Sequence, residues 1–423
     1  MNNFIKNFLR KIKLSPVVII FGIFAVVLSF FVFKHWQKPT LSPEKLLSCL
    51  TTTPQGRYLA DAPCLQHVTS DLMAVYSTTD LLKYISAPST PVVVHIYAHS
   101  IAHFIGEQTF LKTMSVEITL EQCNPDVEYG CIHGAIGAAA VQDLGVNEAE
   151  GEELVHADST TVENVAEKFC ASDNFQLCHA IGHILFQVSP DYTKILETCN
   201  KVSNKDVDKR EACARGVFME AAGPTSSLSP SLNSLASNIT YSGICDQIPS
   251  AYQHPCFRHL PKIQRYLFEK NGVSSTRERL SISRGICEKL TGAPRADCIE
   301  SIGLNTDGVF ADIDDPSRQK FCVSFDTWAD KKACILGVVG SFLNTFAYND
   351  AVNYCHTGVN PMLKDFCYHS LFSIAAQVSM SPTIGVICDK ESTANECSQK
   401  FKEYLVIKST LQDYALGLYG DRR

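Results

Sequence analysis

The chain has 423 residues, of which 45% are hydrophobic and 19% are charged, a balance typical of a folded protein. Its net charge is −7, but residues 1–38 contain six basic and no acidic side chains, so the remainder carries −13. This acidic remainder argues against sequence-independent binding to nucleic acid, which depends on basic patches.

Residues 16–33 form an apolar run of 18 residues without a charge. A membrane-spanning helix needs about 20 such residues. Basic side chains are in excess before the run, which predicts that the N-terminus stays inside. No small-residue cleavage site follows the run, and this favours an uncleaved anchor over a signal peptide. We therefore expect a cytoplasmic basic tail (1–14), one transmembrane helix (15–33) and an extracytoplasmic remainder, periplasmic or extracellular.

The 18 cysteines occur in nine closely spaced pairs. Each pair encloses 7 to 14 residues, whereas 20 to 58 residues separate one pair from the next. An even number of cysteines in an exported chain indicates a disulfide framework, so we predict nine local bridges and no free thiol. The predicted bridges are Cys49–Cys64, Cys123–Cys131, Cys170–Cys178, Cys199–Cys213, Cys245–Cys256, Cys287–Cys298, Cys322–Cys334, Cys355–Cys367 and Cys388–Cys397.

The segments between these pairs share a pattern. Those that begin at Cys178, Cys334 and Cys367 open with an apolar run, break at a turn and resume as a short apolar stretch ending in cysteine. This pattern predicts a helix, a turn and a second helix, with a disulfide across the following loop. Small residues soon after the second cysteine would let neighbouring helices approach closely. They are Gly134, Gly216, Ser301, Gly337 and Ser370.

Units of 33 to 42 residues in the C-terminal half match the repeat length of helical-hairpin solenoids. The predicted fold is therefore all-α: a disulfide-stapled helical-hairpin repeat, or α-solenoid, preceded by one transmembrane helix. Separate small disulfide domains are the alternative, but the segments between the pairs are too apolar to stand alone. We expect a stalk and first stapled unit (34–90), His-rich repeats (91–223), a Ser/Pro-rich linker (224–240) and C-terminal repeats (241–423).

Histidines concentrate in the first half, where seven of the 13 lie between His95 and His183. His99 and His103 are four residues apart, as are His179 and His183, and such a spacing places two side chains on one face of a helix. His133 lies just behind a cysteine in the intervening unit. Because consecutive repeat units stack, these positions would be neighbours.

We therefore hypothesise a transition-metal site for zinc or iron, since imidazole and carboxylate groups suit both metals. If the protein is an enzyme, a metal-dependent hydrolase or oxidoreductase is the expected class, with Glu220 or Glu107 as the candidate base. The expected ligands, lying within one coordination shell, are His99, His103, His133, His179, His183 and Glu220.

Other interpretations stay open at this point. Each histidine could instead be a core residue that binds a carbonyl group, Glu107 could pair with a surface lysine, and Glu220 could pair with Arg215 or Arg258. Haem held by two of the histidines is a further cofactor alternative. A non-catalytic scaffold that binds peptides or proteins on a concave solenoid face is the alternative function. Hydrolase, P-loop, dinucleotide-binding and zinc-protease motifs are absent.

Overall fold

The structure is a computed structural model that describes most of the chain after residue 43. The described residues are 44–52, 58–87, 89–123, 129–145, 159–172, 174–189, 191–221, 241, 243–306, 310, 321–344, 347–378, 387–388 and 393–406. Every described residue belongs to one compact unit, Pro43–Arg423.

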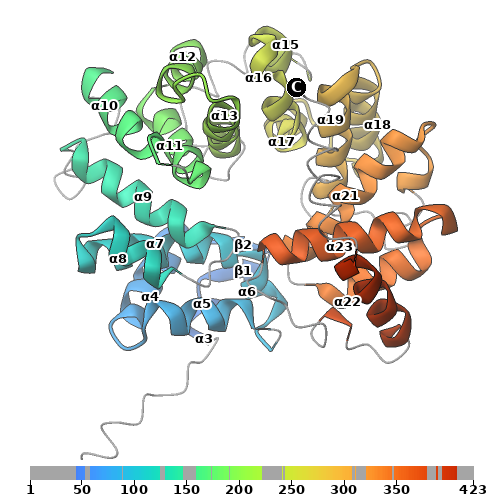
Figure 1. The fold of residues 1–423 in the computed structure, drawn as a ribbon, viewed down its shortest axis with the longest axis horizontal. Coiled ribbons are helices and arrows are strands. Elements are labelled where there is room, and N and C mark those ends of the chain that lie inside the picture. The colour runs from blue at the N-terminus through green and yellow to red at the C-terminus, as the bar shows by residue number, and fades with distance from the viewer. Residues whose placement is uncertain are drawn as a thin grey trace, which may run out of the picture. The chain divides into compact units, whose positions relative to one another are not determined.

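The described residues are almost entirely helical (Figure 1). The first part comprises α3 (Glu44–Leu47), β1 (Leu50–Thr52), β2 (Tyr58–Ala60), α4 (Ala62–Met73), α5 (Thr78–Ser86), α6 (Val92–Ile96), α7 (Ala98–Thr113), α8 (Val116–Gln122), α9 (Gly130–Asp143), α10 (Ser159–Cys170), α11 (Phe175–Val188), α12 (Tyr192–Val202) and α13 (Val207–Ala221). The second part comprises α15 (Gly243–Gln247), α16 (Ser250–Phe257), α17 (Leu260–Lys270), α18 (Thr276–Cys287), α19 (Gly292–Leu304), α21 (Trp328–Asn344), α22 (Tyr348–Asn353), the π-helical turn η4 (Tyr354–Gly358), the 3-10 turn η5 (Pro361–Leu363), α23 (Lys364–Val378) and a last helix over 394–406.

One small β-hairpin departs from the predicted all-helical fold. Strands β1 and β2 pair antiparallel, with Leu50 opposite Ala60 and Thr52 opposite Tyr58. The β-branched residues Thr51 and Thr52 favour extended backbone at this point. The prediction of helices alone therefore holds for the described chain apart from these six residues.

All nine predicted disulfides are confirmed, and no cysteine is left free. Each closes a loop of 8 to 15 residues, which stabilises the fold by about 2–3 kcal/mol in the chain-entropy description. Most bridges join a short helix, or its end, to a longer helix that follows it in the chain. Such a framework is typical of chains that fold in an oxidising compartment outside the cytoplasm.

We call α4, α7, α9, α11, α13, α16, α19, α21 and α23 the inner helices; they contact one another in chain order, as stacked repeats require. In seven of them the second cysteine of a disulfide pair is fully inaccessible: α9, α11, α13, α16, α19, α21 and α23. Successive contacts run from α4 to α7, α9, α11, α13, α16, α19, α21 and α23 (Figure 1).

Two glycines allow α7 and α9 to touch through their backbones. A Cβ atom on Gly134 would lie 1.8 Å from the carbonyl oxygen of His103, and one on Gly106 would lie 1.9 Å from that of Cys131. No side chain fits at such distances, so only glycine permits this spacing. The same reciprocal arrangement joins α11 to α13 through Gly182 and Gly216, and α19 to α21 through Gly303 and Gly337.

Within the described residues, no helix is long and apolar enough to cross a membrane. The apolar run 16–33, its basic flank and the linker 224–240 all lie outside those residues.

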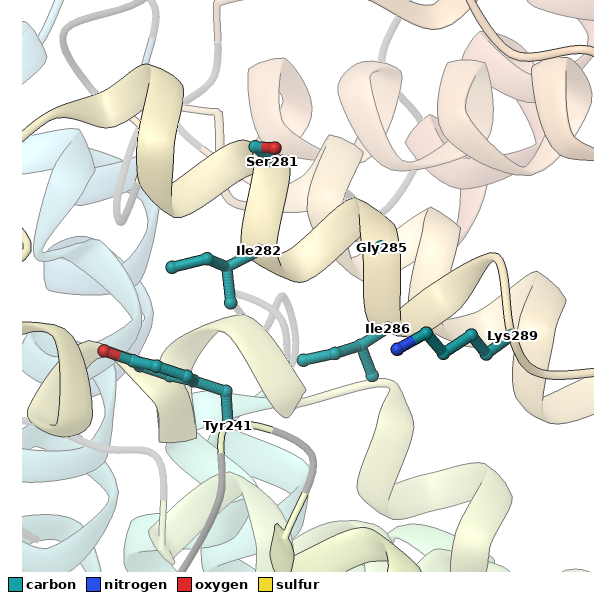
Figure 2. Close-up of a pocket in the computed structure, with 6 residues that line it drawn as sticks. All are labelled: Tyr241, Ser281, Ile282, Gly285, Ile286 and Lys289. Carbon is teal, nitrogen blue, oxygen red and sulfur yellow. The ribbon is translucent and has the colours of Figure 1, made fainter.

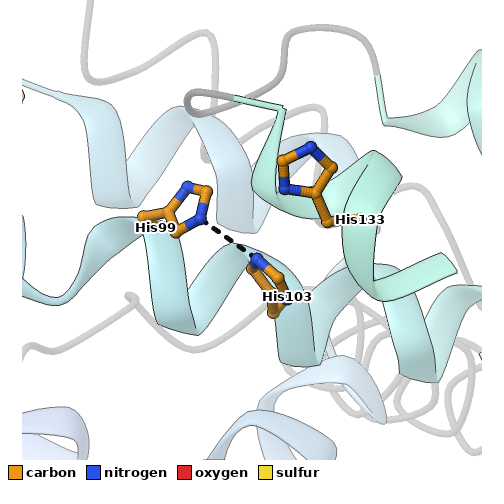
Figure 3. Close-up of side chains that lie close together, drawn as sticks. All are labelled: His99, His103 and His133. Atoms are coloured by element: carbon orange, nitrogen blue, oxygen red, sulfur yellow. Dashed lines mark hydrogen bonds between the residues drawn. The ribbon is translucent and has the colours of Figure 1, made fainter. Parts of the chain in front are cut away.

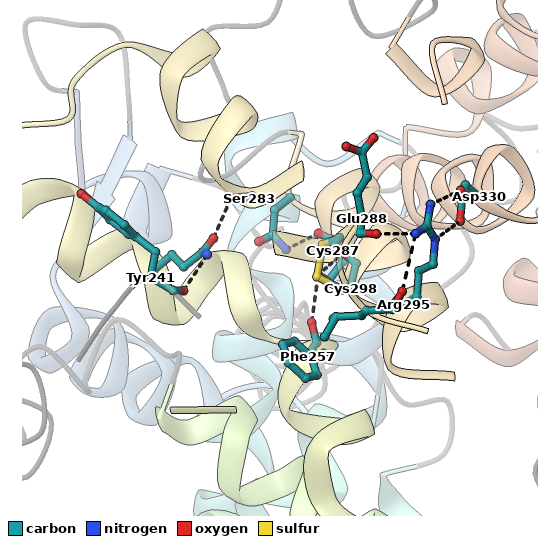
Figure 4. The surroundings of a disulfide bond; sticks show 12 residues. Tyr241, Phe257, Ser283, Cys287, Glu288, Arg295, Cys298 and Asp330 are labelled. Atoms are coloured by element: carbon teal, nitrogen blue, oxygen red, sulfur yellow. Dashed lines mark hydrogen bonds and ion pairs between the residues drawn. A yellow bond between two sulfur atoms is a disulfide. The ribbon is translucent and has the colours of Figure 1, made fainter. Parts of the chain in front are cut away.

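A partly buried ion pair joins α19 to α21 beside the Cys287–Cys298 bridge (Figure 4). Nε and Nη2 of Arg295 donate to the two carboxylate oxygens of Asp330, at 2.9 and 2.7 Å. Nη1 of Arg295 donates to the backbone carbonyl of Glu288 at 2.6 Å. Asp330 is 3% exposed, and the hydrogen bonds from Arg295 hold the pKa of its carboxyl below the ordinary value.

We expect Asp330→Asn to lower the free energy of unfolding by about 2–3 kcal/mol at pH 7, the range for hydrogen bonds between charged groups. Since the folded-state pKa of Asp330 is depressed, its stabilisation is fully present above a pH of about 4. It is lost as the pH falls through the folded-state value. Denaturant unfolding of both proteins between pH 7 and pH 2 should therefore show a difference that shrinks with acidification.

Asp365→Asn is the matched control for this prediction. Asp365 also pairs with a cation, Lys400, at 2.7 Å, but its side chain is 69% exposed. An exposed pair contributes at most about 1 kcal/mol, so this variant should barely change the unfolding curve. A difference between wild type and Asp330→Asn that stays constant with pH would contradict the role assigned to the Asp330 carboxylate.

Candidate metal centre

Three consecutive inner helices bring five histidines together, and we call this set the histidine cluster. Helix α7 supplies one pair at four-residue spacing, helix α11 supplies a second, and α9, which contacts both helices, supplies the fifth residue. The members are His99, His103, His133, His179 and His183.

Within each pair the Nε2 atoms face each other. The Nε2 atoms of His99 and His103 are 3.1 Å apart, and those of His179 and His183 are 3.3 Å apart. One helical turn separates the members of each pair, as the sequence spacing predicted.

His133 lies between the two pairs. Its ring centroid is 4.8 Å from that of His179 and 5.4 Å from those of His103 and His183. Figure 3 shows the rings of His99, His103 and His133 gathered between α7 and α9. The glycine contacts between these helices explain the approach, because Gly134 follows His133 directly and touches the backbone of His103.

The cluster divides into two groups of three, not the single coordination shell that the sequence suggested. His99, His103 and His133 form one group, and His133, His179 and His183 form the other. In each group, the candidate ligand atoms lie within 4.8 Å of one another. His133 belongs to both groups.

Burial favours the neutral form of three members of the cluster. Burial lowers the pKa of His103, His133 and His179 well below the usual imidazole value, and the charges of neighbouring histidines lower it further. A neutral imidazole keeps a lone pair on one nitrogen, which is the form that binds metals.

Contacts on the far nitrogens fix the tautomers of the α11 pair. Nδ1 of His179 lies 3.1 Å from the carbonyl oxygen of Ala212, which can only accept, so this nitrogen carries the proton. Nδ1 of His183 lies 3.0 Å from a carboxylate oxygen of Glu220 and donates to it. In the neutral rings, both Nε2 atoms then carry lone pairs that face each other across 3.3 Å. Such an arrangement requires a cation between them, either a metal ion or a proton.

His133 supplies a second unusual feature. Its side chain is 5% exposed, and neither ring nitrogen has a hydrogen-bond partner within the described part of the chain. Leaving a buried polar group unsatisfied costs about 1–3 kcal/mol. A ligand at the centre of the cluster would remove this cost.

The two predicted carboxylates occupy outer positions. Glu220 belongs to neither ligand group: it orients His183 and also accepts from Nε2 of Gln187 at 3.1 Å. A carboxylate on the far nitrogen of a ligating histidine is a common feature of metal sites. Glu107 accepts from Nε2 of Gln66 at 2.9 Å and also belongs to neither group, so the structure does not place it as a base within the cluster.

Sequence reasoning missed a buried ionic network that continues from the cluster across α13, α16 and α19. Nδ1 of His254 contacts the carboxylate of Asp297, which is fully buried, and its Nε2 lies 3.5 Å from Glu211 and 3.3 Å from Arg215. Arg215 thus contacts Glu211 on its own helix and His254 on α16. Because the partners are about 40 residues apart in sequence, no local motif predicts these contacts.

Arg258 completes this region of the ionic network. Its Nη1 lies 2.9 Å from a carboxylate oxygen of Glu300 on α19. This ion pair links α16 to α19.

A separate surface pocket lies along α18, which supplies most of its lining residues (Figure 2). Its one charged side chain is Lys289, and the hydroxyl of Tyr241 accepts a hydrogen bond from Asn271 at 3.1 Å. No member of the histidine cluster lines it. The lining residues are Tyr241, Ser281, Ile282, Gly285, Ile286 and Lys289.

Comparisons of the chain with protein family models, with curated proteins and with solved structures give no match. The histidine cluster is therefore the feature of the chain that points to a function.

Proposed function

We propose that the protein binds a first-row transition metal through the imidazole nitrogens of the histidine cluster. One observation carries this proposal: the Nε2 lone pairs of His179 and His183 face each other across 3.3 Å while their Nδ1 atoms are committed to Ala212 and Glu220. The buried, unsatisfied ring of His133 beside them supports it.

The donor set favours zinc, iron, copper or nickel over calcium or magnesium. Imidazole suits the first four metals, whereas calcium and magnesium prefer oxygen ligands. Every cysteine is bridged, so no thiolate competes for the ion. Three protein ligands in each group leave a coordination position open, as in catalytic metal sites. Hydrolysis or redox chemistry at that position is the corresponding enzymatic proposal.

The architecture that carries this site is proposed to be an α-solenoid on the outer side of a membrane. The ordered contacts between inner helices and the nine staples support a repeat. The apolar run 16–33 with its basic flank supports a single anchor.

The metal content of the purified full chain tests the proposal. After incubation with Zn²⁺ and removal of the free ion, we expect stoichiometric zinc in the wild type. Replacing both His179 and His183 by alanine should weaken binding at the α11 pair at least about 100-fold, because it removes the two residues whose lone pairs face each other. Glu220→Gln, which keeps both ligands, should weaken binding about 10–100-fold. Elemental analysis and zinc titration measure all three proteins.

His67→Ala is the control, since the His67 side chain is 80% exposed and lies outside the cluster. This variant should bind zinc as the wild type does, and circular dichroism should show equal helicity in every protein. If a proton rather than a metal joins the α11 pair, wild type and double variant will hold equally little zinc. That result would reject the metal proposal.

A further inference from the structure

We propose that the histidine cluster holds two metal ions, joined by the ring of His133 as a bridging imidazolate. This inference rests on the proposed function and specifies how many ions the site takes and how they are connected.

The two pairs are each built to chelate one ion. With metal–nitrogen bonds of about 2.0–2.1 Å, two nitrogens on one ion lie about 2.9–3.4 Å apart. The Nε2 separations of 3.1 Å in the α7 pair and 3.3 Å in the α11 pair both fall in this range. Each pair therefore fits one ion with little movement.

The two pairs do not belong to one group of candidate ligand atoms in this geometry. The ring centroids of His103 and His183, on opposite helices, are 6.1 Å apart. The candidate ligand atoms likewise fall into two groups of three, with His133 as the common member. One ion at each pair, with His133 between them, uses all five residues.

Both ring nitrogens of His133 are candidate metal ligands. A single ion would satisfy one ring nitrogen and leave the other buried without a hydrogen-bond partner among the described residues. Two ions satisfy both nitrogens. Because Nδ1 and Nε2 lie on different edges of the ring, the two ions would be about 6 Å apart.

Formation of the imidazolate bridge releases one proton. Neutral His133 and two divalent ions give the bridged pair, and the N–H proton of His133 passes to solvent, as metal binding at a protonated ligand requires. The imidazolate and the nearby Glu220 carboxylate offset two of the four positive charges. Anions from solvent at the open coordination positions offset the others.

Copper(II) is a suitable probe, because an imidazolate bridge couples the two unpaired electrons and suppresses the electron paramagnetic resonance signal. We expect the full chain to bind two Cu²⁺ with a low-temperature signal well below that of two independent spins. His133→Gln keeps both pairs and should recover the full signal for every copper bound. His369→Gln, outside the cluster, should behave as the wild type.

The outcomes separate this inference from the function on which it rests. One copper per chain, or two with full independent signals in the wild type, would overturn the bridge and leave the metal-binding proposal standing. A chain that binds no copper, zinc, iron or nickel would overturn both.

Discussion

Gly134→Ala is expected to destabilise the fold by about 3 kcal/mol or more, at or above the upper end for overpacking. The new Cβ would lie 1.8 Å from the carbonyl oxygen of His103 and 2.6 Å from its carbonyl carbon. Both atoms belong to the backbone of α7, so relief requires the two helices to move apart. That movement would also separate His133 from the α7 pair. Denaturant unfolding and zinc titration of the variant should therefore both show a loss.

Gly285→Ala provides the matched control. Gly285 also lies within a helix, α18, but a Cβ there meets no atom within 4 Å. Alanine is favoured over glycine in a helix by about 0.5–1 kcal/mol, so this variant should be as stable as the wild type or slightly more stable. Equal losses in the two variants would show that the α7–α9 contact is not as close as described.

Asp297→Ala is expected to lower the free energy of unfolding by about 3–5 kcal/mol, the usual effect of removing one member of a buried ionic pair. Asp297 is completely inaccessible and contacts Nδ1 of His254, which is 7% exposed. Without the carboxylate, Nδ1 of His254 loses this contact, while Nε2 keeps Glu211 and Arg215 nearby. Thermal and denaturant unfolding measure the loss.

Glu269→Ala is the matched control for Asp297→Ala. Glu269 forms an ion pair with Arg265 one turn away at 3.3 Å, but both side chains are more than half exposed. Its removal should change stability by less than about 0.5 kcal/mol. If Asp297→Ala has an effect of similar size, the network across α13, α16 and α19 does not stabilise the stack.

Local sequence patterns were sufficient for the disulfides, the helical fold class and the meeting of the five histidines. Cysteine spacing identified the bridges because each closes a short loop, and the four-residue steps placed His99 with His103 and His179 with His183. Small residues after the second cysteine also marked helix contacts, as Gly134 shows.

Features that depend on the rotation and depth of neighbouring helices were not predictable in this way. The sequence suggested Glu220 as a ligand, but its carboxylate reaches the far nitrogen of His183. The division of the cluster at His133 and the contact between His254 and Asp297 are set by packing between segments about 40 residues apart. Gly106, which faces Gly134, has no cysteine near it in sequence to mark its role.

X-ray absorption at the metal edge of the zinc-loaded full chain tests the central claim most directly, because it reports the atoms bound to the ion. We predict a shell of nitrogen neighbours at about 2.0–2.1 Å, with the outer-shell scattering that imidazole rings produce and no sulfur near 2.3 Å. An oxygen shell without imidazole scattering, or a sulfur shell, would contradict the assignment of the histidine cluster as the metal centre.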